Sequence, residues 1–200
     1  MCLGSRAVRA AYKARGLIFR YPSVIFMTDI EVKTETQNKF IVAIFALALA
    51  AAFCFFAARA VFPKKYAGLV EREAARYGLD ENEIYAVITA ESGFDPSAVS
   101  RSGAKGLMQL MPSTAEFCAS VLGVGEYDLC EPETNIRFGC FYLDYLKARF
   151  DGDNVYAAYN AGEGNVRLWL ESGGGIAFEE TRTYVSRVNL YRKIYAFLYK

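Results

Sequence analysis

The chain has 200 residues, 23 basic and 22 acidic side chains and no histidine, so its net charge at neutral pH is +1. This total conceals an asymmetry, because residues 1–63 have a net charge of +5 and residues 64–200 a net charge of −4. The acidic C-terminal part argues against a nucleic-acid partner, and the absence of histidine leaves acid–base chemistry near neutral pH to a carboxylate, a thiol or an amine.

An uncharged apolar run occupies residues 40–58 and is about long enough to cross the ~30 Å core of a bilayer as a helix. The basic residues before it predict a cytoplasmic segment at 1–39, a transmembrane signal anchor at 40–62 and a domain outside the cytoplasm. A buried core helix is one alternative. Another is a signal peptide cleaved near residues 58–60, which would release a secreted product. A start at Met27 instead of Met1 would remove five basic residues and weaken the predicted orientation.

Beyond Pro63, apolar residues recur at helical spacing, and no segment alternates convincingly with the period of two that marks a strand. Helices are predicted at residues 64–77, from Asp80 to about Glu91, and at 112–123, 132–150, 153–161, 165–170 and 181–199. Asp80 is expected to cap the second helix, with Glu83 as its capping-box partner. Residues 173–175 are expected to form a flexible loop. The sequence therefore predicts a mainly α-helical domain over residues 64–200.

Five cysteines form no clear disulfide framework. Cys140 falls in an apolar helical stripe, which favours a packed thiol, whereas Cys118 and Cys130 could form a bridge outside the membrane. With no histidine and no Cys-x-x-Cys pair, we expect neither a zinc site nor a cofactor.

Glu91 is the strongest candidate for chemistry. It follows Ile84, Val87 and Ile88 at spacings of seven, four and three, so it extends an apolar helical face. Burial there disfavours the anion and raises the pKa, and the nearby C-terminal end of the helix acts in the same direction. Such a carboxyl group suits acid catalysis on glycosides. The alternative is a glutamate at the rim that reaches water or pairs with a basic residue.

Short polar residues follow Glu91 along the chain. Ser100, Gln109 and Asn160 could hydrogen-bond sugar hydroxyl and N-acetyl groups, and Tyr159 could offer a phenol or a stacking face. A glycine-rich segment between them permits close backbone approach. Taken singly, each residue is equally explained as a turn serine, a cap asparagine or a core tyrosine.

The order of these residues resembles the catalytic domain of soluble lytic transglycosylases, a lysozyme-like family related to goose-type lysozyme. Four segments carry the resemblance: residues 91–100, 103–115, 158–166 and 180–185. Residues 135–143 fit as well, so the resemblance covers about residues 64–200. Ala177 departs from the pattern, since relatives often have a proline there, and this affects only the loop conformation.

The resemblance implies a lysozyme-like fold and cleavage of peptidoglycan between N-acetylmuramic acid and N-acetylglucosamine, with a 1,6-anhydro product. Glu91 would be the single catalytic acid and base, and Glu180 would anchor the last helix near the site. The residues implied to bind glycan are Ser100, Gln109, Met111, Tyr159, Asn160 and Glu180.

Most glycosidases use two carboxylates, and in such an enzyme Glu91 would need a second carboxylate as its partner. Asp95 lies beyond the helix-ending Gly93, and Glu163 is expected beside the groove without a direct catalytic role. Two other functions remain: a lysozyme-type hydrolase on the same fold, and a membrane-tethered scaffold that binds peptidoglycan without cleaving it.

Overall fold

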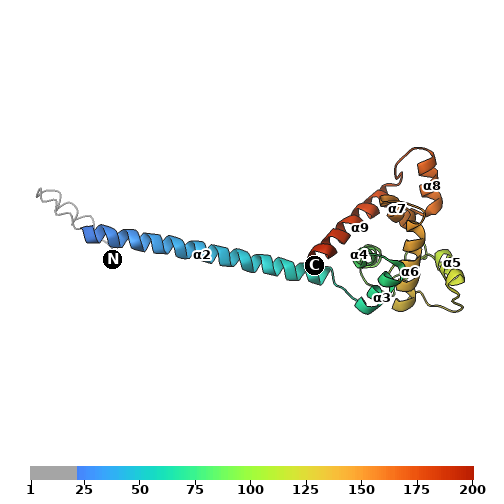
Figure 1. Cartoon of the computed structure of the whole chain (residues 1–200), viewed down its shortest axis with the longest axis horizontal. Coiled ribbons are helices and arrows are strands. Elements are labelled where there is room, and N and C mark those ends of the chain that lie inside the picture. Colours follow the sequence, from blue (N-terminus) through green and yellow to red (C-terminus); the bar gives the residue numbers. More distant parts are fainter. Residues whose placement is uncertain (1–21) are drawn as a thin grey trace, which may run out of the picture. The chain divides into compact units, whose positions relative to one another are not determined.

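The computed structural model describes residues 22–200, with side chains from residue 34 onward, and this part of the chain is mainly helical (Figure 1). The cysteine and basic residues of segment 1–21 lie outside the described residues. Within the described range only isolated bridges, Val99 to Lys105 and Lys105 to Leu110, resemble strand pairing. The helices are α2 (Pro22–Val61), α3 (Ala67–Tyr77), α4 (Glu81–Glu91), α5 (Pro112–Leu122), α6 (Pro132–Lys147), α7 (Asp153–Ala161), α8 (Glu163–Glu171) and α9 (Glu179–Leu198).

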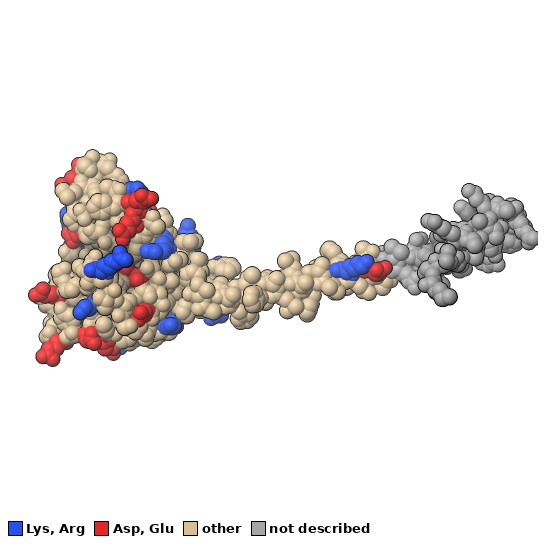
Figure 2. Space-filling model, turned by 180° about the vertical axis from the view of Figure 1, so that it is seen from behind, with Lys and Arg blue, Asp and Glu red and all other residues tan. Residues whose placement is uncertain are grey.

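The chain divides into two compact units, Met1–Cys54 and Phe55–Lys200. Within α2, the segment Thr34–Val61 is long and apolar enough to cross a membrane by length and composition, with a mean hydropathy of 2.8. None of its most apolar window is buried among the described residues, whereas the core helix of a soluble protein is mostly buried. Figure 2 shows a long uncharged surface along this helix. An exposed apolar surface of this length is unfavourable in water.

Of the two interactions predicted at the start of α4, one is confirmed. Asp80 caps the helix, because the amide of Asn82 donates to its Oδ1 at 2.9 Å. Glu83 does not complete a capping box. Its side chain is buried and accepts hydrogen bonds from Lys147 Nζ at 2.7 Å and from the Tyr156 hydroxyl at 2.8 Å. Partners on α6 and α7 compensate the buried carboxylate, which a local sequence motif could not indicate.

The core of the second unit surrounds α4. All five residues from Ile84 to Ile88 are fully buried, because α9 packs along one side of α4 and α3 packs on another. From α9, the buried side chains Tyr184, Val185, Val188 and Tyr195 complete this core. Glu91 is therefore the last residue of the helix around which the domain is built.

The cysteines of the described part of the chain are all unpaired, so the bridge between Cys118 and Cys130 that the sequence allowed is not formed. Cys118 is buried between α5 and α6, where its Sγ donates to the Phe138 carbonyl oxygen at 3.7 Å. Burial raises the pKa of Cys118 to about 12. Cys140 is buried in α6, as the packed thiol expected.

Candidate active site

Glu91 ends α4 in a half-buried position. Burial raises the pKa of its carboxyl group from 4.5 to about 7, while the nearby Tyr184 hydroxyl and the positive charge of Arg187 act in the opposite direction. Among the described residues, the causes of this pKa shift are burial, Tyr184 and Arg187, and none of them is a second carboxylate. A carboxyl group with this pKa can both give and accept a proton near neutral pH.

The helix stops at Glu91 because the backbone turns sharply. Gly93 has a φ of 59°, which favours glycine, and the amides of Ser92 and Gly93 both donate to the Ile88 carbonyl oxygen, at 3.0 and 3.2 Å. The Ser92 hydroxyl donates to the Leu107 carbonyl oxygen at 2.8 Å. The end of α4 is thus fixed to the loop that precedes α5.

Two tyrosines enclose Glu91. Tyr159 on α7 and Tyr184 on α9 both have a pKa raised well above 10, chiefly by burial and next by the charge of Glu91. The Tyr159 hydroxyl donates to the Met108 carbonyl oxygen at 2.8 Å, which ties α7 to the loop before α5. The Tyr184 hydroxyl is buried and has no hydrogen-bond partner among the described residues, which leaves it available to the Glu91 carboxyl.

The loop between α4 and α5 is stabilised by the side chains expected to bind glycan. The Ala104 amide donates to Ser100 Oγ at 2.9 Å, and Gln109 Nε2 donates to the carbonyl oxygens of Ala98 and Gly106 at 3.0 and 2.8 Å. Gln109 has a φ of 48°, a rare conformation for a residue other than glycine and one that clusters at functional sites. The side-chain nitrogen of Gln109 is bonded within the loop, so its side-chain oxygen remains for a ligand.

Met111 and Asn160 both lie at the surface. Met111 is the N-cap residue of α5 and is 39% exposed. Asn160, near the end of α7, accepts a hydrogen bond at its Oδ1 from the buried Thr181 hydroxyl at 2.9 Å. Exposed polar and thioether groups of this kind are accessible to a ligand.

Glu180 is exposed in the first turn of α9. Among the described residues, the hydrogen bond between the start of α9 and α7 is made by its neighbour Thr181. Glu163 accepts hydrogen bonds from Arg167 Nη2 at 2.6 Å and Nε at 3.0 Å, and these bonds lower its pKa. A carboxylate held in this way is poorly suited to be a second catalytic group.

Asn135 belongs to the framework of the site. It lies in the segment 135–143 that fits the resemblance, but the sequence indicated no role for it. It is fully buried, and its Oδ1 accepts from the Met108 amide at 2.7 Å while its Nδ2 donates to the carbonyl oxygens of Lys105 and Leu129 at 3.0 and 2.8 Å. Gly106 lies so close that a Cβ there would collide with Leu129 and with Asn135 itself. The sequence feature that could have indicated this role is the presence of an asparagine within the apolar stripe of the predicted helix.

Thr181 and Tyr184 lie in the segment 180–185 that carries the resemblance, but the sequence indicated no role for them, and Arg187 was missed. Arg187 and Tyr184 lie three positions apart on α9, so they share a face, and the guanidinium carbon of Arg187 lies 5.9 Å from the centroid of the Tyr184 ring. Neither their polarity nor their spacing distinguishes them from other residues of a long amphipathic helix. Their relation to Glu91 depends on how α9 packs against α4.

A cavity of about 580 Å³ lies next to Asn160 along the chain, lined by residues of α7 and α8 that include Ala161, Gly162, Asn165 and Leu168. No group of three or more His, Cys, Asp or Glu that could bind a metal ion is found among the described residues.

Comparison with known proteins gives consistent results. The transglycosylase SLT domain model matches residues 68–181. A soluble lytic murein transglycosylase of Salmonella typhimurium is 37% identical over 150 residues, which cover 67% of this chain and 23% of the relative. A membrane-bound lytic murein transglycosylase C of Edwardsiella ictaluri is 39% identical over 128 residues, which cover 56% of this chain and 35% of the relative.

Among solved structures, the 70 kDa soluble lytic transglycosylase from Escherichia coli aligns with a TM-score of 0.66 and 35% identity, over 70% of this chain and 25% of that one. A 70 kDa soluble lytic transglycosylase solved in complex with bulgecin A aligns with the same TM-score and identity. The chain thus spans about a quarter of the length of the first of these relatives. The mainly α-helical, lysozyme-like fold expected from the ordered motifs is confirmed. Because the family model matches more than half of the chain, from α3 to the start of α9, the chain belongs to the transglycosylase SLT domain family.

Proposed function

We propose that this protein is a membrane-anchored lytic transglycosylase that cleaves the β-1,4 bond between N-acetylmuramic acid and N-acetylglucosamine. The observation that supports this most directly is Glu91, a half-buried carboxyl group whose pKa is raised to about 7 and on which no second carboxylate acts among the described residues. The lytic transglycosylase Slt of Pseudomonas aeruginosa, 38% identical with a TM-score of 0.62, has an inactive mutant in which one glutamate is replaced by glutamine.

In the first step, Glu91 donates its proton to the bridging glycosidic oxygen, and the bond to the muramic C1 breaks. Positive charge develops at C1, and the acetamido oxygen of the same sugar stabilises it from the opposite face. This substrate assistance replaces the second carboxylate that most glycosidases use. The buried surroundings of Glu91 favour the first step because they favour its protonated form.

In the second step, the Glu91 carboxylate takes the proton of the muramic C6 hydroxyl, and the C6 oxygen forms a bond to C1. The product is a 1,6-anhydro sugar, no water is consumed, and Glu91 returns to its protonated form. The groups proposed to bind the glycan are the free side-chain oxygen of Gln109, the exposed Met111 and Asn160, and the loop turn at Ser100. Glu180 and Thr181 are proposed to keep the start of α9 beside the site.

The test uses the full chain in detergent micelles with purified peptidoglycan and mass spectrometry of the released muropeptides. We expect anhydro products from the wild type and none from Glu91→Gln. The matched control is Glu126→Gln, because Glu126 is exposed in the loop before α6 and its removal should leave activity unchanged. Products that carry one additional water would identify a lysozyme-type hydrolase, and binding without any released fragment would identify a scaffold.

We further propose that α2 spans the membrane, with the basic N-terminal segment in the cytoplasm and the domain outside. Support comes from the apolar segment Thr34–Val61 and from relatives named as membrane-bound. Membrane extraction with N-terminal sequencing tests this proposal. A product released by high salt that starts near Val61 would show that the segment is a cleaved signal peptide.

A further inference from the structure

The last turns of α9 contact the end of α2 and the residues that follow it. The Tyr199 hydroxyl donates to the Phe62 carbonyl oxygen at 2.8 Å, and the Tyr195 hydroxyl donates to the Pro63 carbonyl oxygen at 3.2 Å. The Phe62 ring packs edge-on against Tyr195 at a centroid distance of 5.7 Å. Figure 1 shows the C-terminal end of α9 beside the end of α2. We name these contacts the anchor junction.

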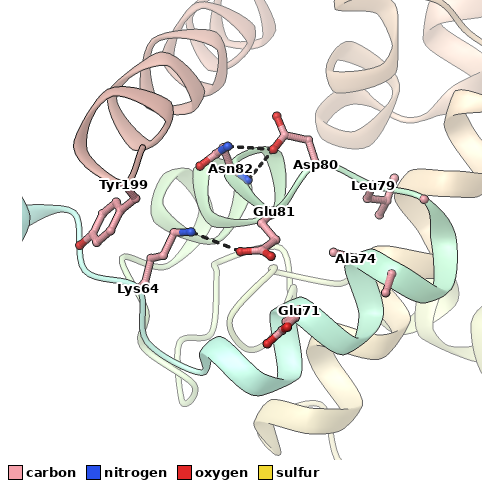
Figure 3. Close-up of a pocket in the computed structure, with 10 residues that line it drawn as sticks. Lys64, Glu71, Ala74, Leu79, Asp80, Glu81, Asn82 and Tyr199 are labelled. Carbon is pink, nitrogen blue, oxygen red and sulfur yellow. Dashed lines mark hydrogen bonds and ion pairs between the residues drawn. The ribbon is translucent and has the colours of Figure 1, made fainter.

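Two basic residues extend the anchor junction. The Arg59 guanidinium lies over the Tyr199 ring, 4.4 Å from its centroid. Lys64 Nζ forms an ion pair with Glu81 Oε2 at 3.2 Å and lies 5.2 Å from the Tyr199 ring centroid. Figure 3 shows Lys64 reaching from the connecting segment toward Glu81 on α4, with Tyr199 on the other side, at the edge of a cavity of about 660 Å³. The junction therefore involves α4, α9 and the residues after α2 together.

Chain continuity fixes where this junction lies relative to a bilayer that contains α2. Arg59 directly follows the apolar run, so it marks the outer end of that run. Phe62 is three residues further, which limits its distance from the end of that run to about 10 Å. Because Tyr199 contacts both residues, the C-terminal end of α9 is confined to the same level.

Three residues at this end of α9 have no role in the core. Phe197 is 67% exposed, and Lys193 and Lys200 are exposed as well. Phe197 lies two residues from Tyr195, so it projects from the side of α9 opposite the one that packs on α4. An exposed aromatic side chain between two lysines is the composition of surfaces that lie in the lipid headgroup region. We name Lys193, Phe197 and Lys200 the α9 end face.

We propose that the α9 end face is a membrane-contact surface: Phe197 inserts among the lipid headgroups of the bilayer that α2 crosses, and Lys193 and Lys200 pair with anionic lipid phosphates. This proposal rests on the membrane anchoring proposed for α2. It is independent of the catalytic proposal, since it uses none of the residues around Glu91. The consequence is that the domain is seated on the membrane at two adjoining points, the end of α2 and the end of α9.

The test uses the one tryptophan of the chain, Trp169 on α8, and the full protein in anionic vesicles whose lipids contain bromine near the headgroups or deep in the acyl chains. Two variants in a Trp169→Phe background contain Phe197→Trp or Phe45→Trp. We expect shallow bromines to quench the fluorescence of the first variant and deep bromines to quench that of the second. The native Trp169 of the wild type should not be quenched by either lipid.

Each outcome decides one question. Quenching in the Phe45→Trp variant without quenching in the Phe197→Trp variant would overturn the α9 end face and leave the anchor intact. Absence of quenching in the Phe45→Trp variant would overturn the anchor itself. Equal quenching of Trp169 and of the Phe197→Trp variant would also overturn the proposal, because contact would then not be specific to α9. Peptidoglycan cleavage by the same samples reports separately on the catalytic proposal.

Discussion

At Glu91, burial and local charges act in opposite directions. Burial favours the neutral acid, while the Tyr184 hydroxyl and Arg187 favour the anion, and the pKa of about 7 is the result. A pKa near the working pH lets one group serve as acid in one step and base in the next. Because α9 supplies both opposing groups, the proton affinity of Glu91 depends on how α9 packs against α4.

The first prediction concerns the Tyr184 hydroxyl. Tyr184→Phe removes the strongest influence that lowers the Glu91 pKa, so that pKa should rise. The alkaline limb of the kcat/KM profile, where Glu91 loses its proton, should therefore move to higher pH. Arg187→Gln should move it in the same direction by a smaller amount that salt diminishes, since Arg187 is exposed. A limb that stays in place or moves to lower pH would show that Tyr184 does not act on Glu91.

The second prediction concerns stability. The folded-state pKa of Glu91 is above the ordinary value of 4.5, so the folded protein binds this proton more tightly than the unfolded chain does. Burial of Glu91 therefore lowers stability progressively as pH rises from about 4.5 to about 7, by at most about 3 kcal/mol at higher pH. Glu91→Gln should be more stable than the wild type at pH 8 and similar at pH 4. Denaturant unfolding of the full chain in micelles at both pH values measures this difference, and equal stability at pH 8 would contradict it.

The sequence indicated Glu91 through its place in an apolar stripe and through the motif order, and in the structure it is the half-buried last residue of α4. Asn135 and Thr181 could not be assigned their roles in the same way. Asn135 supports residues 27 to 30 positions earlier in the chain, and Thr181 reaches Asn160 from another helix. Such contacts depend on tertiary packing, which single-residue patterns do not contain.

At the scale of elements, α6 approaches the loop before α5 closely at a single glycine. A Cβ on Gly139 would collide with the Met108 sulfur, and Met108 is fully buried. This close contact lets the loop lie directly on α6, with Asn135 one turn earlier on the same helix. The loop that supports Gln109 is therefore fixed by two neighbouring positions of α6.

The third prediction follows from this contact. Replacing a glycine by alanine within a helix ordinarily stabilises a protein by about 0.5–1 kcal/mol. Gly139→Ala should instead destabilise the domain by about 1–3 kcal/mol, because Met108 must move within a packed core. Gly68→Ala on α3 is the matched control, since nothing lies within 4 Å of its added Cβ. Denaturant midpoints compare the two variants, and a Gly139→Ala protein as stable as the control would show that the loop yields without cost.

Helix positions were largely predictable, because glycines and prolines mark many of the ends. The predicted α6 extended to Phe150, whereas the helix ends at Lys147, and α8 begins at Glu163 rather than Asn165. The capping role of Glu83 was wrong because Lys147 and Tyr156, more than 60 residues away, bind its carboxylate. Local patterns therefore predicted the helices better than they predicted the partners of buried charges.

At the scale of the whole molecule, the domain is held together without disulfide bonds in the part of the chain that the structure describes. The fourth prediction is that a reducing agent leaves the Tm of the full chain unchanged. Burial raises the pKa of the Cys118 thiol to about 12, so this cysteine should also react slowly with thiol reagents. Calorimetry with and without the reducing agent measures the effect. A fall of several degrees would reveal a bridge that stabilises the protein.

The division into an apolar N-terminal segment and a helical domain was evident from composition and motif order. The contact between the domain and the end of α2 was not, because it joins Phe62 and Pro63 to tyrosines about 130 residues later. Residues so far apart in the sequence share no local pattern, and it is the packing of α9 along α4 that brings them together.

The Tyr195 hydroxyl has a consequence for the range over which the protein can act. It lies 3.2 Å from the Pro63 carbonyl oxygen and 2.7 Å from Thr89 Oγ1, and Thr89 is two residues before Glu91. The Tyr195 side chain thus links the residue after the proposed anchor to the last turn of α4, the helix that ends at Glu91. With the anchoring and the activity that we propose, the protein would cleave only glycan close to the bilayer.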